Sequence, residues 1–317
     1  MAGNMGDMGD MGDMANRALA LGAGALVWPD RVDLPFAVVP DPNGGARASD
    51  TRFGHQGTFT RWTTEWKATA LLAEFTDTAA WQNRATAASN GGTAKAAGGL
   101  TLTPWTERKE FAAGINDGVN EEINLLLIAA ETERADALGE IVGQHMSFVP
   151  HLLALLDATP GSHPATNLLI NSAVLITGFV GQHFKQISQR RRPGQVCPSL
   201  NPPIDVPGHA AYPSGHAAQA HLCALSLADA FGEPPTMTGA ASPLPKLAPA
   251  LGVLPEAGAL PAVRAFAWRV GRNREIAGVH YRSDTLGGRE MAESLYVALR
   301  SMKGYQDLIR TVHAEWN

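Results

Sequence analysis

The sequence predicts an all-α protein, a helical bundle preceded by an irregular N-terminal arm. From Thr63 onward apolar residues recur with the period of an α-helix, whereas the alternating pattern of a β-strand is almost absent. Apolar residues make up 45% of the 317 residues and charged residues 17%, which allows a substantial core. We therefore expect a single helical domain over residues 63–317.

The N-terminal part differs in composition from the rest. Residues 1–62 are rich in Gly, Pro and Asp and lack periodicity, so we expect an extended arm, with the low-complexity MGD repeat within residues 1–14 disordered. No charged start and small-residue cleavage site of a signal peptide is evident. The apolar stretch at 167–184 contains polar residues, which favours a core helix over a membrane span. These features are compatible with a cytoplasmic location, but they leave the compartment open.

The helical patterns are separated by stretches rich in Gly and Pro. The first helix begins near Thr63, and Thr103-Pro104 has the pattern of a helix cap followed by Pro at the first helical position. A helix at 164–190 ends before Arg192-Pro193, because the residue before Pro avoids helical geometry. The remaining segments are a Gly-rich loop at 89–102, helices within 118–157 and at 215–231, 262–276 and 285–302, and a Pro-rich loop at 232–261 that is long enough to shape an entrance.

The charge of the chain limits its partners. A net charge of −5 argues against a broad nucleic-acid surface, which requires a positive field. A local basic cluster in an acidic protein favours a small anion held in a pocket. Cys197 and Cys223 share no metal-ligand spacing, and two cysteines in a chain of this length indicate no disulfide framework.

The first segment with chemical potential is KQISQRRRP, from Lys185 to Pro193. Lys185 and Arg192 are seven residues apart, which is about two helical turns, so on a continuous helix both side chains point to one side. Two converging cations can bind a tetrahedral anion. A solvated basic helix end is the alternative interpretation of this segment.

The second segment is YPSGHAAQAH, in which Ser214 occupies a helix N-cap position. Gly215 lets the backbone approach a ligand, and the free N–H groups of a helix start bind oxyanions. His216 lies one step inside and can transfer a proton near neutral pH. An ordinary cap with a surface histidine is the alternative.

The third segment is GRNREIAGVHYRSD, with Arg274 as a third cation. Asp284 lies four residues after His280, where its carboxylate can fix the imidazole in one tautomer and suit the other nitrogen to bond a metal-like or phosphorus centre. Gly278 offers the bend that Arg274 and His280 need to reach one point. A helix start with a structural histidine is the alternative here.

Taken in order, the three segments resemble one superfamily. Its pattern of K-x6-R-P, P-S-G-H and R-x5-H-x3-D corresponds here to Lys185 with Arg192-Pro193, to Pro213–His216, and to Arg274 with His280 and Asp284. This pattern resembles that of the vanadium-dependent haloperoxidases and type 2 phosphatidic acid phosphatases. The resemblance covers residues 185–284 and implies a helical bundle of the haloperoxidase/acid phosphatase type. Asn273 departs from the phosphatase pattern, which usually has Ser before the third-segment Arg.

The resemblance implies a role for each residue. A haloperoxidase holds vanadate through His280 as the axial ligand to vanadium, in a site that phosphate can also occupy. The equatorial oxygens are bound by Lys185, Arg192, Arg274, Ser214 and Gly215. His216 deprotonates hydrogen peroxide, Lys185 polarises it, and Asp284 orients His280. Halide is then oxidised to hypohalous acid, which halogenates a small organic acceptor. Related haloperoxidases are often homo-oligomers.

The motif alone does not separate haloperoxidase from phosphatase, in which His280 attacks phosphorus and His216 protonates the leaving group. Three neighbours favour a bromide- and iodide-oxidising haloperoxidase. His209 matches a histidine of algal-type bromoperoxidases, where it can tune peroxide activation; a loop histidine of no consequence is its alternative. Gln182 stands where chloroperoxidases have Trp, and the AGVHYRSD stretch resembles the bromoperoxidase version. A soluble acid phosphatase remains the alternative, followed by a non-catalytic anion-binding protein.

Overall fold

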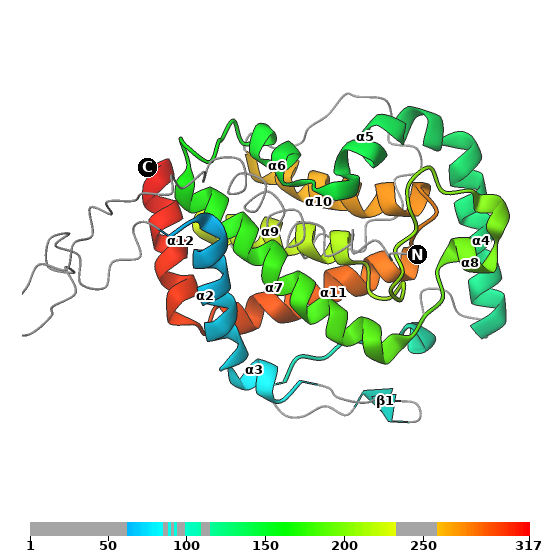
Figure 1. The fold of residues 1–317 in the computed structure, drawn as a ribbon, viewed down its shortest axis with the longest axis horizontal. Helices are drawn as coiled ribbons and strands as arrows, with labels where there is room; N and C mark the ends of the chain where they lie inside the picture. Colours follow the sequence, from blue (N-terminus) through cyan, green and yellow to red (C-terminus); the bar gives the residue numbers. More distant parts are fainter. Residues whose placement is uncertain (1–61, 85–87, 90–91, 94–98, 109–114, 233–258) are drawn as a thin grey trace, which may run out of the picture.

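The chain folds as a bundle of α-helices (Figure 1), as the sequence predicts. The computed structural model describes residues 62–84, 88–89, 92–93, 99–108, 115–232 and 259–317. Strand structure among these residues is a single hairpin, in which β1 (Ala88–Ser89) pairs antiparallel with β2 (Gly92–Thr93). The expected arm and most of the Pro-rich loop, at 1–61 and 233–258, lie outside the described residues.

Four long helices form the centre of the bundle. They are α7 (Pro164–Ser188), α9 (Gly215–Ala230), α10 (Ala259–Ile276) and α11 (Arg282–Leu299). Helix α9 packs against the other three (Figure 1), and its many alanines let the neighbouring backbones approach closely. Because α9 is buried on nearly all sides, its sequence is apolar around the whole helix.

A second group of helices closes one end of the bundle. Helix α2 (Thr64–Thr76) and α12 (Lys303–Trp316) pack against α7, and the short helix α3 (Ala79–Gln82) follows α2. The carboxylate of Glu315 in α12 accepts hydrogen bonds from the backbone N–H groups of Ala165 and Thr166, at 2.8 and 2.9 Å. The last turn of α12 therefore caps the start of α7.

The opposite end is covered by the middle of the chain. Helix α4 (Ile115–Thr132) lies there, and α5 (Arg134–Met146) and α6 (Val149–Leu155) lead back along α10, which all three helices contact (Figure 1). Three short turns complete this end: η3 (Trp105–Glu107), α8 (Pro193–Val196) and η5 (Pro198–Leu200).

Some boundaries differ from those expected. Pro104 precedes only a 3-10 turn, η3, instead of an α-helix. The expected helical region 118–157 is divided among α4, α5 and α6, and Pro150 lies in the first turn of α6. Helix α7 ends at Ser188, before the expected residue 190, and Gln189 takes a left-handed conformation with φ of 49°. Lys185 and Arg192 therefore do not share a helix, and the expected common helical face is wrong.

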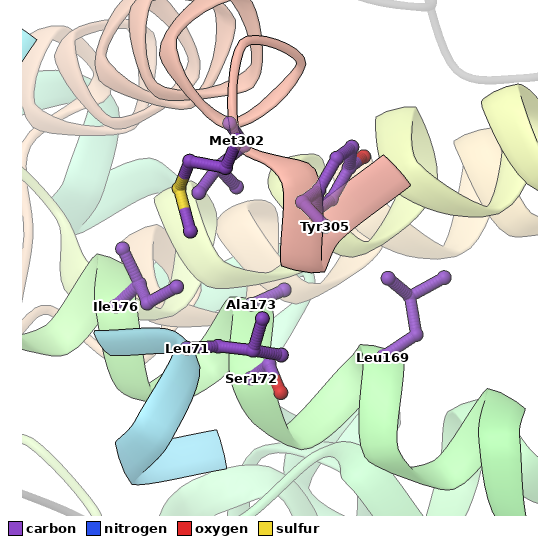
Figure 2. A pocket seen from close by; sticks show the side chains of 8 residues that line it. Leu71, Leu169, Ser172, Ala173, Ile176, Met302 and Tyr305 are labelled. Carbon is purple, nitrogen blue, oxygen red and sulfur yellow. The ribbon is translucent and has the colours of Figure 1, made fainter. Parts of the chain in front are cut away.

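Two features of α7 concern its surroundings. Within the described residues, one stretch passes the length and hydropathy criteria for a membrane span. It is Pro164–Val196, which comprises α7, the following turn and α8, and 56% of its most apolar part is buried inside the protein. Figure 2 shows a narrow apolar pocket between α2, α7 and α12. Its volume of about 10 Å³ is that of a single water molecule at most. It is lined by Leu71, Leu169, Ser172, Ala173, Ile176, Leu299, Met302 and Tyr305. We regard it as a packing gap.

Candidate functional site

The three sequence segments meet at one end of the central helices. Lys185 lies in the last turn of α7 and Arg274 in the last turn of α10, whereas Ser214 and Asp284 lie at the starts of α9 and α11. Figure 1 shows that α7 and α10 run toward this end and that α9 and α11 run away from it. The helix dipoles of α9 and α11 therefore add positive potential here.

His280 is the most firmly oriented imidazole of the site. Its Nδ1 donates to Oδ2 of Asp284 at 3.2 Å, and Asp284 Oδ2 also accepts the backbone N–H of Tyr281 at 2.9 Å. Its Nε2 lies 3.1 Å from Nη1 of Arg192, and since a guanidinium only donates, Nε2 accepts. His280 is 3% exposed. The proton of the ring thus lies on Nδ1, and the lone pair lies on Nε2.

The surroundings keep this pair in one charge state. Burial and the adjacent Arg192 guanidinium hold the pKa of His280 well below its usual 6.5. Burial by itself would raise the pKa of Asp284, but the Arg190 guanidinium and the His280 N–H outweigh it and hold this pKa below its usual 3.8. Near neutral pH the pair is therefore a neutral imidazole beside a carboxylate.

Arg192 and Lys185 converge on the loop that carries His209. Arg192 Nε donates to the carbonyl oxygen of His209 at 3.1 Å, and its Nη2 donates to His209 Nδ1 at 3.0 Å. Lys185 Nζ donates to the carbonyl oxygen of Ala210 at 2.9 Å. Both cations are buried, with exposed fractions of 4% for Lys185 and 1% for Arg192. The structure thus brings Lys185, Arg192, His209 and His280 together, through the turn after α7.

Ser214 precedes α9 as expected, but its side chain does not cap the helix. The backbone N–H of Ser214 donates to the carbonyl oxygen of Asp284 at 3.0 Å, which ties the start of α9 to α11. Ser214 Oγ is fully buried and makes no hydrogen bond with the part of the chain that the structure describes. A buried hydroxyl without a partner is costly in a native protein and indicates a ligand or water. A Cβ atom added at Gly215 would meet no atom within 4 Å, so the space beside this helix start is open.

Arg274 and His216 contact α5. Arg274 Nη2 donates to the carbonyl oxygen of Ile141 at 2.9 Å, and His216 Nε2 donates to that of Gln144 at 3.2 Å. The bend expected at Gly278 is confirmed, since its φ of 77° ends α10 and returns the chain to His280. Asn273, the departure from the phosphatase pattern, donates to Glu140 and Gln144 of α5.

Sequence reasoning missed two residues of this region. Arg190 donates from Nη1 to Asp284 Oδ1 at 2.7 Å, and from Nη2 to Oε2 of Glu122 in α4 at 2.8 Å. The run Arg190-Arg191-Arg192 was a signal for the first residue, but only Arg192 matched the motif. Glu122 lies in a segment that the resemblance does not cover, and nothing in the sequence indicates its role.

The arrangement can bind an oxyanion. The buried cations Lys185 and Arg192, the buried hydroxyl of Ser214 and the open start of α9 supply positive potential and donors, and His280 supplies one nitrogen lone pair. Arg274 lies at the same end of the central helices, whereas the N–H groups at the start of α11 are already bound by Glu122 and Asp284. Among the described residues no group of three or more His, Cys, Asp and Glu side chains is arranged to hold a metal ion, so these residues do not form a many-ligand metal cage. No protein-family model matches this chain, and no curated protein matches it.

Proposed function

We propose that the chain is a vanadate-dependent haloperoxidase that oxidises bromide and iodide with hydrogen peroxide. The observation that carries the oxyanion site is the orientation of His280, whose Nδ1 is bound to Asp284 and whose Nε2 lone pair faces the Arg192 guanidinium. The choice of haloperoxidase over phosphatase rests on His209, Gln182 and the stretch around His280. A single neutral imidazole, surrounded by buried cations, fits a ligand in which one central atom carries several anionic oxygens. The all-α fold is compatible with the haloperoxidase type of helical bundle.

The residues of the chain fit vanadate by their chemistry. His280 would hold vanadate through Nε2, and Lys185, Arg192 and Arg274 would neutralise its oxygens. Ser214 Oγ, buried and without a hydrogen-bond partner, supplies a further donor beside the open space at Gly215. Bound vanadate would supply the electrophilic centre at which hydrogen peroxide becomes reactive toward halide.

The other side chains position the site and move protons. Asp284 keeps the proton of His280 on Nδ1 and so leaves the lone pair on Nε2, which Arg192 would release when the ring bonds the anion. His216 takes a proton from hydrogen peroxide, and Lys185 polarises the peroxide. His209 contacts Arg192 and adjusts the placement of this guanidinium. Hypohalous acid leaves the site and halogenates a small organic acceptor.

A phosphatase uses the same features, with Nε2 of His280 as the nucleophile, so the assay must measure both activities. Purified protein is incubated with and without orthovanadate and tested for peroxide-dependent bromination of a dione dye, and separately for hydrolysis of p-nitrophenyl phosphate. Bromination that requires vanadate supports the proposal. Hydrolysis without vanadate-dependent bromination would replace it with the phosphatase.

A further inference from the structure

Arg190 connects the candidate site to a part of the chain outside the motif segments. Its Nη1 binds Oδ1 of Asp284 at 2.7 Å, whereas His280 binds Oδ2 of the same carboxylate. The two oxygens of Asp284 are thus held by different partners. These two contacts together fix the plane of the carboxylate. Arg190 and Asp284 are both buried.

The guanidinium of Arg190 is itself fixed from several sides. Glu122 Oε2 accepts from its Nη2 at 2.8 Å, and the hydroxyl of Ser283 accepts from its Nη1 at 2.6 Å. The rings of Trp105 and Tyr281 lie 4.7 and 3.9 Å from its central carbon, which is cation–π contact. A planar fork with partners in its plane and rings near it has little freedom to rotate.

Glu122 also holds the helix start that carries Asp284. Its Oε1 accepts the backbone N–H of Ser283 at 2.7 Å, and its Oε2 accepts the hydroxyl of Ser283 at 2.8 Å. One carboxylate from α4 therefore fixes both Arg190 and the first turn of α11, where negative charge is also favoured by the helix dipole.

We propose that Glu122 and Arg190 are positioning residues that orient the Asp284 carboxylate and thereby keep the His280 proton on Nδ1. They touch neither the anion nor the substrates, and they act through Asp284. The consequence for anion binding rests on the proposed function, whereas the consequence for the His280 ring does not. The inference assigns a role to α4, which the motif resemblance does not reach.

The test compares two variants with a matched control in the full-length protein. Arg190→Lys keeps the positive charge but loses the planar fork, and Glu122→Gln removes the negative charge and leaves one acceptor oxygen, so that either Arg190 or the backbone N–H of Ser283 faces an amide NH2 group. Arg191→Met removes the neighbouring guanidinium, which is exposed and donates to the carbonyl oxygen of Gln195. For each protein, NMR of the imidazole nitrogens measures the His280 tautomer without ligand, and calorimetry measures the dissociation constant of orthovanadate.

We expect the wild type and Arg191→Met to show the Nδ1–H tautomer of His280 and equal affinities. Arg190→Lys and Glu122→Gln should show a mixture of His280 tautomers and an orthovanadate dissociation constant about tenfold higher or more. Losses of this size are usual when a residue that orients a coordinating side chain is replaced. If Arg190→Lys does not fold, Glu122→Gln carries the same comparison. Folded variants with the wild-type tautomer and affinity would overturn the inference. A wild type that does not bind orthovanadate contradicts the proposed function, but the tautomers still test the positioning role.

Discussion

Nη1 of Arg192 lies 3.1 Å from Nε2 of His280, so a guanidinium hydrogen points at the imidazole lone pair. The opposite nitrogen of the same ring donates to Asp284 at 3.2 Å. Both nitrogens of His280 are therefore assigned, and the reactive one faces a cation that cannot be deprotonated. When the ring bonds a central atom through Nε2, Arg192 gives up this hydrogen bond and is placed to donate to the oxygens of the bound group.

A substitution at Ser214 should change anion binding without lowering the stability of the fold. Because Ser214 Oγ makes no hydrogen bond among the described residues, we expect Ser214→Ala to leave the melting temperature unchanged or slightly higher. If the hydroxyl donates to a bound oxyanion, calorimetry should give an orthovanadate dissociation constant raised roughly tenfold. A fall in stability with unchanged affinity would show that the hydroxyl is structural.

The buried His221 should make stability depend on pH. It is fully buried in α9, and its ring nitrogens make no hydrogen bond to any residue in the described ranges. Burial lowers its pKa to about 3, with Arg289 and Arg282 adding to the effect. Below about pH 6.5 the unfolded chain binds a proton at this residue and the folded protein does not. As the pH is lowered below this value, His221 should therefore reduce the free energy of unfolding by up to about 1.4 kcal/mol per pH unit.

His221→Leu removes this effect without removing a hydrogen bond. Urea unfolding of the wild type and the variant at pH 7.5, 6 and 5 measures the two slopes. We expect the variant to lose less stability than the wild type on acidification. The substitution also removes the contact between the His221 ring and Trp268. Parallel pH dependences would show that His221 is not the neutral group we describe.

Glu315 offers a stability control far from the site. Its carboxylate accepts from the N–H groups of Ala165 and Thr166 and from the Thr166 hydroxyl, so Glu315→Gln should lower the free energy of unfolding by about 1–2 kcal/mol. Since α7 places Lys185 about 30 Å along its axis from Ala165, orthovanadate affinity should not change. Chemical denaturation and calorimetry on the same samples test both statements. A large loss of affinity would mean that α7 transmits strain to the site.

His209 should matter more for bromide than for iodide. It binds the Arg192 guanidinium through Nδ1 and through its carbonyl oxygen, and only the first contact is lost in His209→Ala. Bromide is harder to oxidise than iodide, so its turnover should fall more in this variant. Steady-state rates with both halides measure this, with the exposed His151→Ala as control. Equal losses for the two halides count against a specific role.

Local signals in the sequence predicted part of this structure. The helix start at Ser214 and the bend at Gly278 follow from backbone preferences of single residues, and both are present. The convergence of Lys185 and Arg192 was expected from helical spacing, but it arises from the left-handed Gln189 and the turn that follows. Such a turn is chosen by tertiary contacts, which a periodic pattern does not contain.

The hydrogen bonds of Arg190 and Glu122 around Asp284 could not be predicted from the sequence for the same reason. Arg190 stands two residues before a motif arginine, and Glu122 lies more than sixty residues earlier on another helix. Their role depends on α4 packing beside the start of α11, as their hydrogen bonds show. No spacing rule along the chain indicates a contact of this kind.

The binding of orthovanadate by the wild type and by His280→Ala tests the central claim most directly. Calorimetry should show one orthovanadate bound per chain in the wild type, with an affinity lost by a hundredfold or more (about 2.7 kcal/mol) in His280→Ala. Thermal unfolding of both proteins without ligand verifies that the variant is folded. Equal affinities in the two folded proteins, or no binding to the wild type, would contradict the account.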